Sequence, residues 1–287
     1  MEKYDIYKDI EKRTGGDVYI GVVGPVRTGK STFVSRFMQL SVIPNIAGKN
    51  KKTIAIDEMP QSGAGKTIMT TEPKFVPGEA VTIKVAGGGR ARVRLIDCVG
   101  YTVKGSLGLE EDGHARLVKT PWSETPLPFE KAAEIGTEKV IKEHSTIGIV
   151  VTTDGSFTEI SREAYAESEE RVINELKEMG KPFVIVLNVK DPSNNKSQEL
   201  AESLKEKYGA EVALLNVENI TEEQIDDLLA SVLLEFPLRT ACVVIPRWAR
   251  TLSEDNELIA ALLDTIRKET CYALKMGDYK KIEKNLE

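Results

Sequence analysis

Gly24-Pro25-Val26-Arg27-Thr28-Gly29-Lys30-Ser31 is the stretch of sequence that decides the fold. It matches the pattern G-x-x-x-x-G-K-[ST] in full, and this pattern forms a phosphate-binding loop when it joins a strand to a helix. An apolar run at 18–23 precedes the stretch, and a helical pattern at 30–40 follows it. The glycines let backbone N–H groups surround a phosphate chain at the start of a helix. The sequence therefore predicts a P-loop.

This loop is expected to bind the phosphates of a nucleotide together with Mg²⁺. A lysine at the position of Lys30 places its charge between the β- and γ-phosphates, and a hydroxyl at the position of Ser31 is a Mg²⁺ ligand. Arg27 would either offset negative charge in the transition state or face the solvent. The residues expected to line the nucleotide here are Gly24, Pro25, Val26, Arg27, Thr28, Gly29, Lys30, Ser31 and Thr32.

Strand and helix patterns alternate along the rest of the chain. Short apolar runs recur at 81–85, 93–96, 147–151, 183–187 and 212–215. Amphipathic stretches with helical period lie at 159–179, 198–208 and 222–235. This alternation predicts βαβ units and a mainly parallel sheet. The fold class is therefore α/β, a P-loop NTPase.

Two stretches interrupt the alternation, and one composition break divides the chain. Residues 44–80 are polar and long for a loop, and residues 100–128 resemble a surface insertion. At Phe236-Pro237 the composition changes, which predicts a P-loop NTPase domain at 1–237 and the beginning of a second domain at 238–287. We expect a strand at 241–245 and a helix at 257–279 in that second part.

Composition excludes several other classes of function. The 287 residues are 41% hydrophobic and 29% charged, as in a globular protein, and no apolar run reaches the length of a membrane span. Three scattered cysteines and two histidines argue against a disulfide framework and against histidine-based metal chemistry. A net charge of −6 argues against nucleic-acid binding. No signal peptide is recognisable, so we expect a cytoplasmic protein.

A motif with a carboxylate follows the apolar run at 93–96. Asp97-Cys98-Val99-Gly100 is a D-x-x-G motif at the end of a predicted strand, where an aspartate beside a P-loop holds Mg²⁺ and the glycine N–H bonds the γ-phosphate. In nucleotide switches, a loop threonine between these two motifs binds Mg²⁺ and senses the γ-phosphate. Here Thr71 is the expected ligand and Thr70 its expected neighbour, the alternative being a threonine-rich edge strand.

The sequence gives its least clear prediction for the base of the nucleotide. A guanine site needs N-K-x-D after a later strand, and Asn188 and Asp191 stand in that register. The lysine that would flank the base is replaced by Val189, and no S-A-K motif follows the run at 212–215. The pattern therefore favours ATP and leaves a guanine-nucleotide switch as the alternative.

Several of these stretches together closely resemble stage IV sporulation protein A, a family of spore-coat morphogenetic ATPases of endospore-forming bacteria. The resemblance covers essentially the whole chain and lies in residues 24–31, 61–77, 97–103, 134–137, 144–148 and 152–155. It implies the translation-factor-like branch of P-loop GTPases, with hydrolysis of ATP. By position, it makes Lys30 the phosphate lysine, Thr70 and Thr71 the sensor threonines and Asp97 the Walker B acid.

The resemblance also implies a biological setting. Members of the family hydrolyse ATP to assemble into a layer around the forespore in the mother-cell cytoplasm. Their expected partners are other copies of the same protein, other spore-coat proteins and a small amphipathic protein of the forespore membrane. The last of these is bound through regions beyond the present sequence, because members of the family are considerably longer. The chain is therefore expected to be a truncated member.

One residue differs from the usual P-loop switch pattern at a position that matters for the mechanism. The residue after the D-x-x-G motif is Tyr101, where many P-loop switches have a glutamine that orients the attacking water. Water would then be held by Thr70, by Thr71 or by a residue of a partner. A nucleotide-binding scaffold without turnover remains a further alternative.

Overall fold

The computed structural model describes residues 15–60, 72–85, 89–106, 110–111, 114–240, 242–245, 247–248, 251, 256–271 and 273–279. The chain divides into two compact units, Met1–Ser231 and Val232–Glu287. The domain boundary expected after residue 237 lies inside the second unit and stays a prediction.

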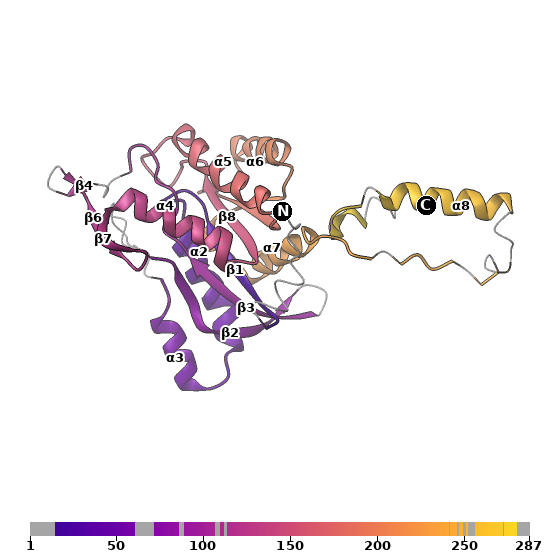
Figure 1. The fold of residues 1–287 in the computed structure, drawn as a ribbon, viewed down its shortest axis with the longest axis horizontal. Helices are drawn as coiled ribbons and strands as arrows, with labels where there is room; N and C mark the ends of the chain where they lie inside the picture. Colours follow the sequence, from indigo (N-terminus) through magenta and orange to yellow (C-terminus); the bar gives the residue numbers. More distant parts are fainter. Residues whose placement is uncertain are drawn as a thin grey trace. The chain divides into compact units, whose positions relative to one another are not determined.

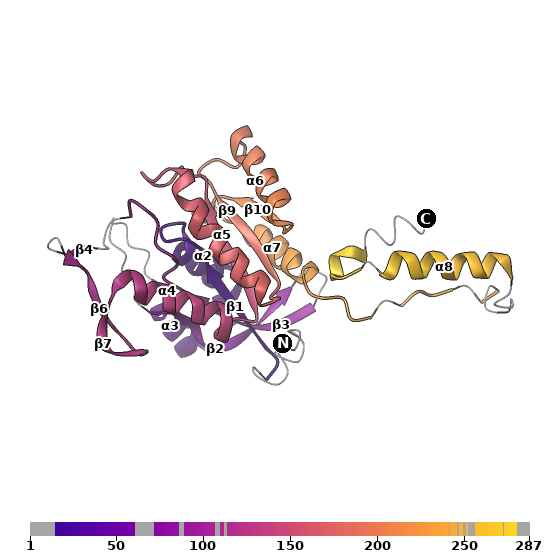
Figure 2. The same ribbon diagram turned by 45° about the horizontal axis from the view of Figure 1, so that its top comes forward.

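The first unit is built on a six-stranded sheet with the order β10-β9-β8-β1-β3-β2 (Figures 1 and 2). Neighbouring strands are parallel except at the edge, where β2 runs antiparallel to β3. The predicted α/β P-loop fold with a mainly parallel sheet is confirmed. The strands are β1 (Asp17–Val23), β2 (Lys74–Val85), β3 (Gly89–Asp97), β8 (Ile147–Thr153), β9 (Phe183–Asn188) and β10 (Val212–Leu215).

Helices follow the strands as the sequence predicts. Helix α2 (Lys30–Phe37) leaves the P-loop and continues as a short π-helix, Met38–Val42. The stretch 159–179 becomes α5 (Arg162–Glu178), and the stretch 222–235 becomes α7 (Glu222–Leu234). Because Asn194 accepts a hydrogen bond from the backbone N–H of Lys196, α6 (Asn195–Tyr208) begins slightly earlier than predicted.

The core lies on both faces of the sheet. Every residue of β8 is buried, which explains why the central strands appear in the sequence as continuous apolar runs. On one face, Val150 and Ile185 pack with Val172 and Ile173 of α5. Figure 2 shows α5 and α6 lying side by side over β8–β10. The alternate strand residues Ile149 and Val186 are also buried, so the opposite face is covered as well.

The stretch 44–80 is not one long loop. It contains α3 (Lys49–Asp57) and the first part of β2, while residues 61–71 lie outside the described part. Helix α3 lies near β2 in both views (Figure 1). Only Ala55 of this helix is buried, and Ile54 and Ile56 are exposed. The helix therefore has no apolar stripe of period 3.6 by which it could be recognised in the sequence.

The stretch 100–128 is partly regular as well. It forms a two-stranded ribbon of β6 (Leu117–Thr120) and β7 (Ser123–Pro128), besides the short pair β4 (Glu110–Glu111) and β5 (His114–Ala115). Helix α4 (Phe129–Lys139) follows β7 and had not been anticipated. Its buried residues are Phe129, Ala132, Ala133, Gly136 and Thr137. Because most of these are small or polar, the sequence shows no apolar stripe that would predict the helix.

The second unit contains α8 (Glu257–Cys271) and a short 3-10 turn, Met276–Asp278. The helix is shorter than expected, and residues 242–245 do not form the expected strand. A bridge between Pro237 and Lys275 ties the two ends of this unit together. In the described ranges of the chain, no helix is long and apolar enough to cross a membrane.

Candidate functional site

The P-loop joins β1 to α2 in a conformation that presents helix N–H groups. Gly24, Arg27 and Gly29 all have positive φ, at 137°, 64° and 97°. The hydroxyl of Thr28 donates to the carbonyl of Pro25 at 3.0 Å and closes the turn. The first helical bond runs from Phe33 N–H to Gly29 O, so the N–H groups before Phe33 have no partner within the helix. Such a loop is a ready anion-binding site.

Close backbone contacts explain the glycines at positions 24 and 100. A Cβ on Gly24 would lie 2.2 Å from the carbonyl oxygen of Val151. A Cβ on Gly100, whose φ is 92°, would lie 2.2 Å from the carbonyl oxygen of Gly24 and 2.5 Å from Lys30 Nζ. The D-x-x-G segment therefore lies directly against the P-loop and its lysine, as the motif spacing predicts.

Lys30 is buried beside the loop, with an exposed fraction of 4%. Its Nζ donates to the carbonyl of Pro25 at 2.5 Å. Burial lowers the pKa of the Lys30 amine, and the nearby Cys98 and Asp97 act in the opposite direction. An ammonium group with so little water around it interacts strongly with an incoming phosphate.

Asp97 ends β3 and is also buried, with an exposed fraction of 1%. Its Oδ2 accepts a hydrogen bond from Ser31 Oγ at 2.8 Å, and its Oδ1 is buried without a hydrogen-bond partner in the structure. Burial raises the pKa of Asp97 to about 6, against the opposing effects of Ser31 and Lys30.

The donor set at this point fits Mg²⁺. A carboxylate oxygen without a partner and an adjacent hydroxyl are hard oxygen ligands of the kind that Mg²⁺ takes. No cluster of three or more metal-binding side chains occurs among the residues that the structure describes. Mg²⁺ is held in nucleotide sites by one or two protein groups together with phosphates and water.

Tyr101 points away from the P-loop. Its hydroxyl donates to the carboxylate of Glu175, with distances of 2.7 and 2.6 Å to the two oxygens, and the guanidinium of Arg171 lies 4.1 Å from its ring centroid. Burial, followed by the bond to Glu175, raises the pKa of Tyr101. The Tyr101 carbonyl accepts a hydrogen bond from Val26 N–H at 2.8 Å. Its side chain therefore does not replace the water-orienting glutamine.

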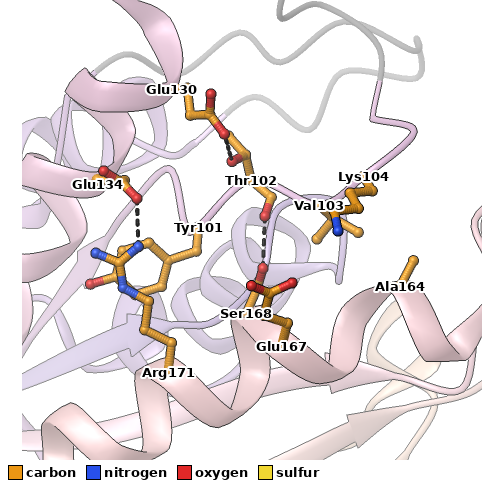
Figure 3. A pocket seen from close by; sticks show the side chains of 10 residues that line it. All are labelled: Tyr101, Thr102, Val103, Lys104, Glu130, Glu134, Ala164, Glu167, Ser168 and Arg171. Atoms are coloured by element: carbon orange, nitrogen blue, oxygen red, sulfur yellow. Dashed lines mark hydrogen bonds and ion pairs between the residues drawn. The ribbon is translucent and has the colours of Figure 1, made fainter.

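A cavity of about 280 Å³ lies beside Tyr101, between the segment 101–104 and helices α4 and α5 (Figure 3). Carboxylates and cations from the two helices surround it, among them Glu130, Glu134 and Arg171. Arg171 contacts Glu134 through Nη1 at 2.5 Å. This ion pair joins α5 to α4 beside the segment that follows the D-x-x-G motif.

Asn188 braces the P-loop from the end of β9. Its Nδ2 donates to Thr28 O at 3.0 Å, and its Oδ1 accepts from Val217 N–H at 3.1 Å. Val189 is fully buried in the core and does not flank a base. Asp191 is exposed, and its Oδ1 accepts hydrogen bonds from the N–H and hydroxyl of Ser193, which lower the pKa of Asp191.

Replacing Asn188 with alanine is expected to destabilise the protein in the absence of nucleotide. The change removes two buried hydrogen bonds and leaves Thr28 O and Val217 N–H without this partner, at a cost of about 2–4 kcal/mol. Urea unfolding of the nucleotide-free variant measures the loss. Asn194→Ala, which removes an exposed helix cap, is the control and is expected to cost about 1 kcal/mol. Equal losses in the two variants would contradict a bracing role for Asn188.

The structure brings together most of the residues that the sequence singles out. Lys30, Ser31, Asp97 and Gly100 meet at the P-loop, and Asn188 reaches the same loop. Thr70 and Thr71 lie outside the described residues, so their roles stay predictions. Thr137, which contacts Gly100, lies in a stretch of the family resemblance, but the sequence assigns it no role because a buried threonine in a helix matches no phosphate-site motif.

Comparison with known proteins adds a family match. Residues 1–237 match the family described as stage IV sporulation protein A, ATPase domain. The chain is 52% identical over 268 residues to stage IV sporulation protein A of Bacillus anthracis, a match that covers 93% of this chain and 54% of that protein. It is 50% identical over 275 residues to the protein of that name from Bacillus subtilis (strain 168). That match covers 96% of this chain and 56% of that protein. The chain thus spans about half the length of these relatives.

The chain is also similar, at low sequence identity, to solved structures. The chain is similar to a variant of SsGBP, with a TM-score of 0.40 and 16% identity, over 78% of this chain and 60% of that one. A likeness of this size carries no argument about the site.

Proposed function

This chain belongs to the stage IV sporulation protein A family and contains its ATPase domain, and from that premise we propose that its P-loop binds Mg²⁺·ATP and hydrolyses the γ-phosphate bond. The observation that carries the proposal is the buried Asp97–Ser31 pair, with one unpartnered carboxylate oxygen, beside the buried amine of Lys30. A carboxylate, a hydroxyl and an ammonium in this arrangement suit a metal-bound polyphosphate.

The chain's own groups have distinct tasks in this proposal. N–H groups of the P-loop and of the first turn of α2 bind the β- and γ-phosphates, and Lys30 neutralises charge between them. Ser31 and Asp97 would hold Mg²⁺, with Thr71 as the expected third protein ligand. When bound, the metal withdraws charge from the phosphate oxygens. The protein thus supplies positioning and charge neutralisation.

Water is oriented by a group other than Tyr101, since the hydroxyl of that residue bonds Glu175. Thr70, Thr71 and a residue of a second copy are the candidates for this role. Arg27 is a further candidate for neutralising charge in the transition state, because its backbone lies in the loop itself. A site without a fixed water-orienting side chain is expected to turn over slowly.

The contacts around Asn188 support ATP over GTP. Both hydrogen-bonding ends of its side-chain amide bond the protein itself, and the buried Val189 offers no long side chain to cover a guanine. The exposed Asp191 favours the second candidate, a guanine-nucleotide switch, because an exposed carboxylate in that register accepts the N1 and N2 hydrogens of guanine.

The test is phosphate release from ATP and GTP, measured side by side with Mg²⁺ and with Lys30→Ala as the blank. We expect release from ATP that disappears in the variant. A preference for GTP would favour the switch, and release from neither nucleotide above the blank would favour a scaffold without turnover.

In the cell, we place this activity in a longer protein that assembles on the forespore. ATP hydrolysis would drive self-assembly in the mother-cell cytoplasm, with other spore-coat proteins and a small amphipathic membrane protein as partners. Sedimentation of the full-length protein with ATP, compared with its Lys30→Ala variant, tests the link. Equal pelleting of the two proteins would separate assembly from hydrolysis.

A further inference from the structure

The N–H group of Gly100 has a partner inside the protein. It donates to the hydroxyl oxygen of Thr137 at 3.1 Å. Thr137 belongs to α4 and is completely buried. The Thr137 hydroxyl in turn points its proton toward Cys98 Sγ, 4.0 Å away, so its lone pairs are free to accept from Gly100. A helix outside the two phosphate motifs therefore holds the glycine of the D-x-x-G motif.

Gly100 also lies close to the phosphate lysine. A Cβ built on it would lie 2.5 Å from Lys30 Nζ and 2.2 Å from the carbonyl oxygen of Gly24. In P-loop switches, contacts with the γ-phosphate order the segment at this position and are released on hydrolysis. A single N–H makes one strong hydrogen bond, so it serves either the γ-phosphate or Thr137.

The same two helices hold the residues that follow Gly100 (Figure 3). Thr102 Oγ1 donates to Glu130 of α4 at 2.9 Å, and Ser168 Oγ of α5 donates to the carbonyl of Thr102 at 2.7 Å. Tyr101 bonds Glu175 of α5. The segment 100–102 is thus fixed on α4 and α5 in one arrangement, and in that arrangement its first N–H is directed to Thr137.

We propose that Thr137 is a positioning residue that competes with the γ-phosphate of the nucleotide for the N–H of Gly100. The inference rests on the proposed function, since it concerns the same nucleotide site. Binding of a triphosphate breaks the bond between Gly100 and Thr137, whereas binding of a diphosphate leaves it intact. Thr137 therefore weakens the affinity for triphosphate alone and favours return of the segment to α4 after hydrolysis.

The test compares Thr137→Val, which removes the hydroxyl at nearly constant volume, with Thr137→Ser, which keeps it. Binding of the β,γ-imido analogue of ATP and of ADP is measured by calorimetry with Mg²⁺. We expect Thr137→Val to bind the analogue about fivefold more tightly than the wild type, which corresponds to about 1 kcal/mol. Its affinity for ADP stays unchanged, and Thr137→Ser resembles the wild type for both ligands.

A second readout needs no nucleotide. The amide hydrogen of Gly100 is expected to exchange faster in Thr137→Val than in the wild type, while Thr137→Ser keeps the slow rate and amides within α5 are unaffected. Unchanged exchange at Gly100, or an unchanged preference between the analogue and ADP, would overturn the competition alone. A wild-type protein that binds neither nucleotide would overturn the proposed function and the competition with it.

Discussion

Replacing Lys30 with methionine is expected to lower ATP hydrolysis by about 100-fold or more and, at the same time, to make the nucleotide-free protein more stable. The loss of activity follows from removing the buried charge that faces the phosphates. The gain in stability follows from the burial that lowers the pKa of the Lys30 amine, since the folded state disfavours its charged form. The carbonyl of Pro25 keeps the hydroxyl of Thr28 as a donor, so the variant leaves no orphaned acceptor.

The sign of the pH dependence follows from the same shift. The folded protein binds the Lys30 proton less tightly than the unfolded chain does, so the wild type gains stability as pH rises toward the ordinary lysine pKa of 10.5. The advantage of the methionine variant is therefore greatest below the pKa of Lys30 in the folded protein and shrinks as pH rises toward 10.5. Urea unfolding at several pH values measures it, with Lys131→Met, an exposed lysine of α4, as the control. A variant no more stable than the wild type at pH 8 would contradict the burial argument.

The sequence alone predicts the parts of the fold whose residues follow a regular pattern. The P-loop, the central strands and helices α5 to α7 follow from runs of apolar residues and from the glycines at 24, 29 and 100. Helix α3 was missed because it buries a single residue, and α4 because its buried face contains Gly136 and Thr137 rather than large apolar side chains. Local pattern is informative only where a segment buries a regular apolar face.

The site likewise contains residues that the sequence predicts and contacts that it does not. Lys30, Ser31 and Asp97 were predictable because phosphate chemistry requires those side chains at those spacings. The contacts of Tyr101 with Glu175, of Gly100 with Thr137 and of Asn188 with Thr28 were not. Each joins residues far apart in the chain through an ordinary hydrogen bond, and only the packed positions of α4, α5 and β9 make them neighbours. They are the contacts that decide which groups remain free to bind a nucleotide.

Replacing Asp97 with asparagine is expected to reduce ATP hydrolysis by about 100-fold, because an amide is a poor ligand for Mg²⁺, and to stabilise the metal-free protein above pH 6. Burial raises the pKa of Asp97 from 3.8 to about 6, so the folded protein binds this proton more tightly than the unfolded chain. The contribution of protonated Asp97 to the free energy of unfolding is fully present below pH 4. It is lost as pH rises to about 6, by an amount on the order of 3 kcal/mol. Asparagine does not ionise and avoids that loss.

The measurement is urea unfolding in EDTA between pH 4 and 8, followed through Trp122 in a Trp248→Phe background, because Trp122 belongs to the first unit and Trp248 to the second. The stability of the asparagine variant relative to the wild type should rise between pH 4 and 6 and stay constant above, whereas the exposed-site control Asp226→Asn should show no such rise. Adding Mg²⁺ and ATP should then stabilise the wild type more than the asparagine variant, because the variant lacks the carboxylate that would hold the metal. A stability difference between the two proteins that does not change with pH would contradict the raised pKa of the buried carboxylate. Equal stabilisation of the two proteins by Mg²⁺ and ATP would show that Asp97 does not bind the metal.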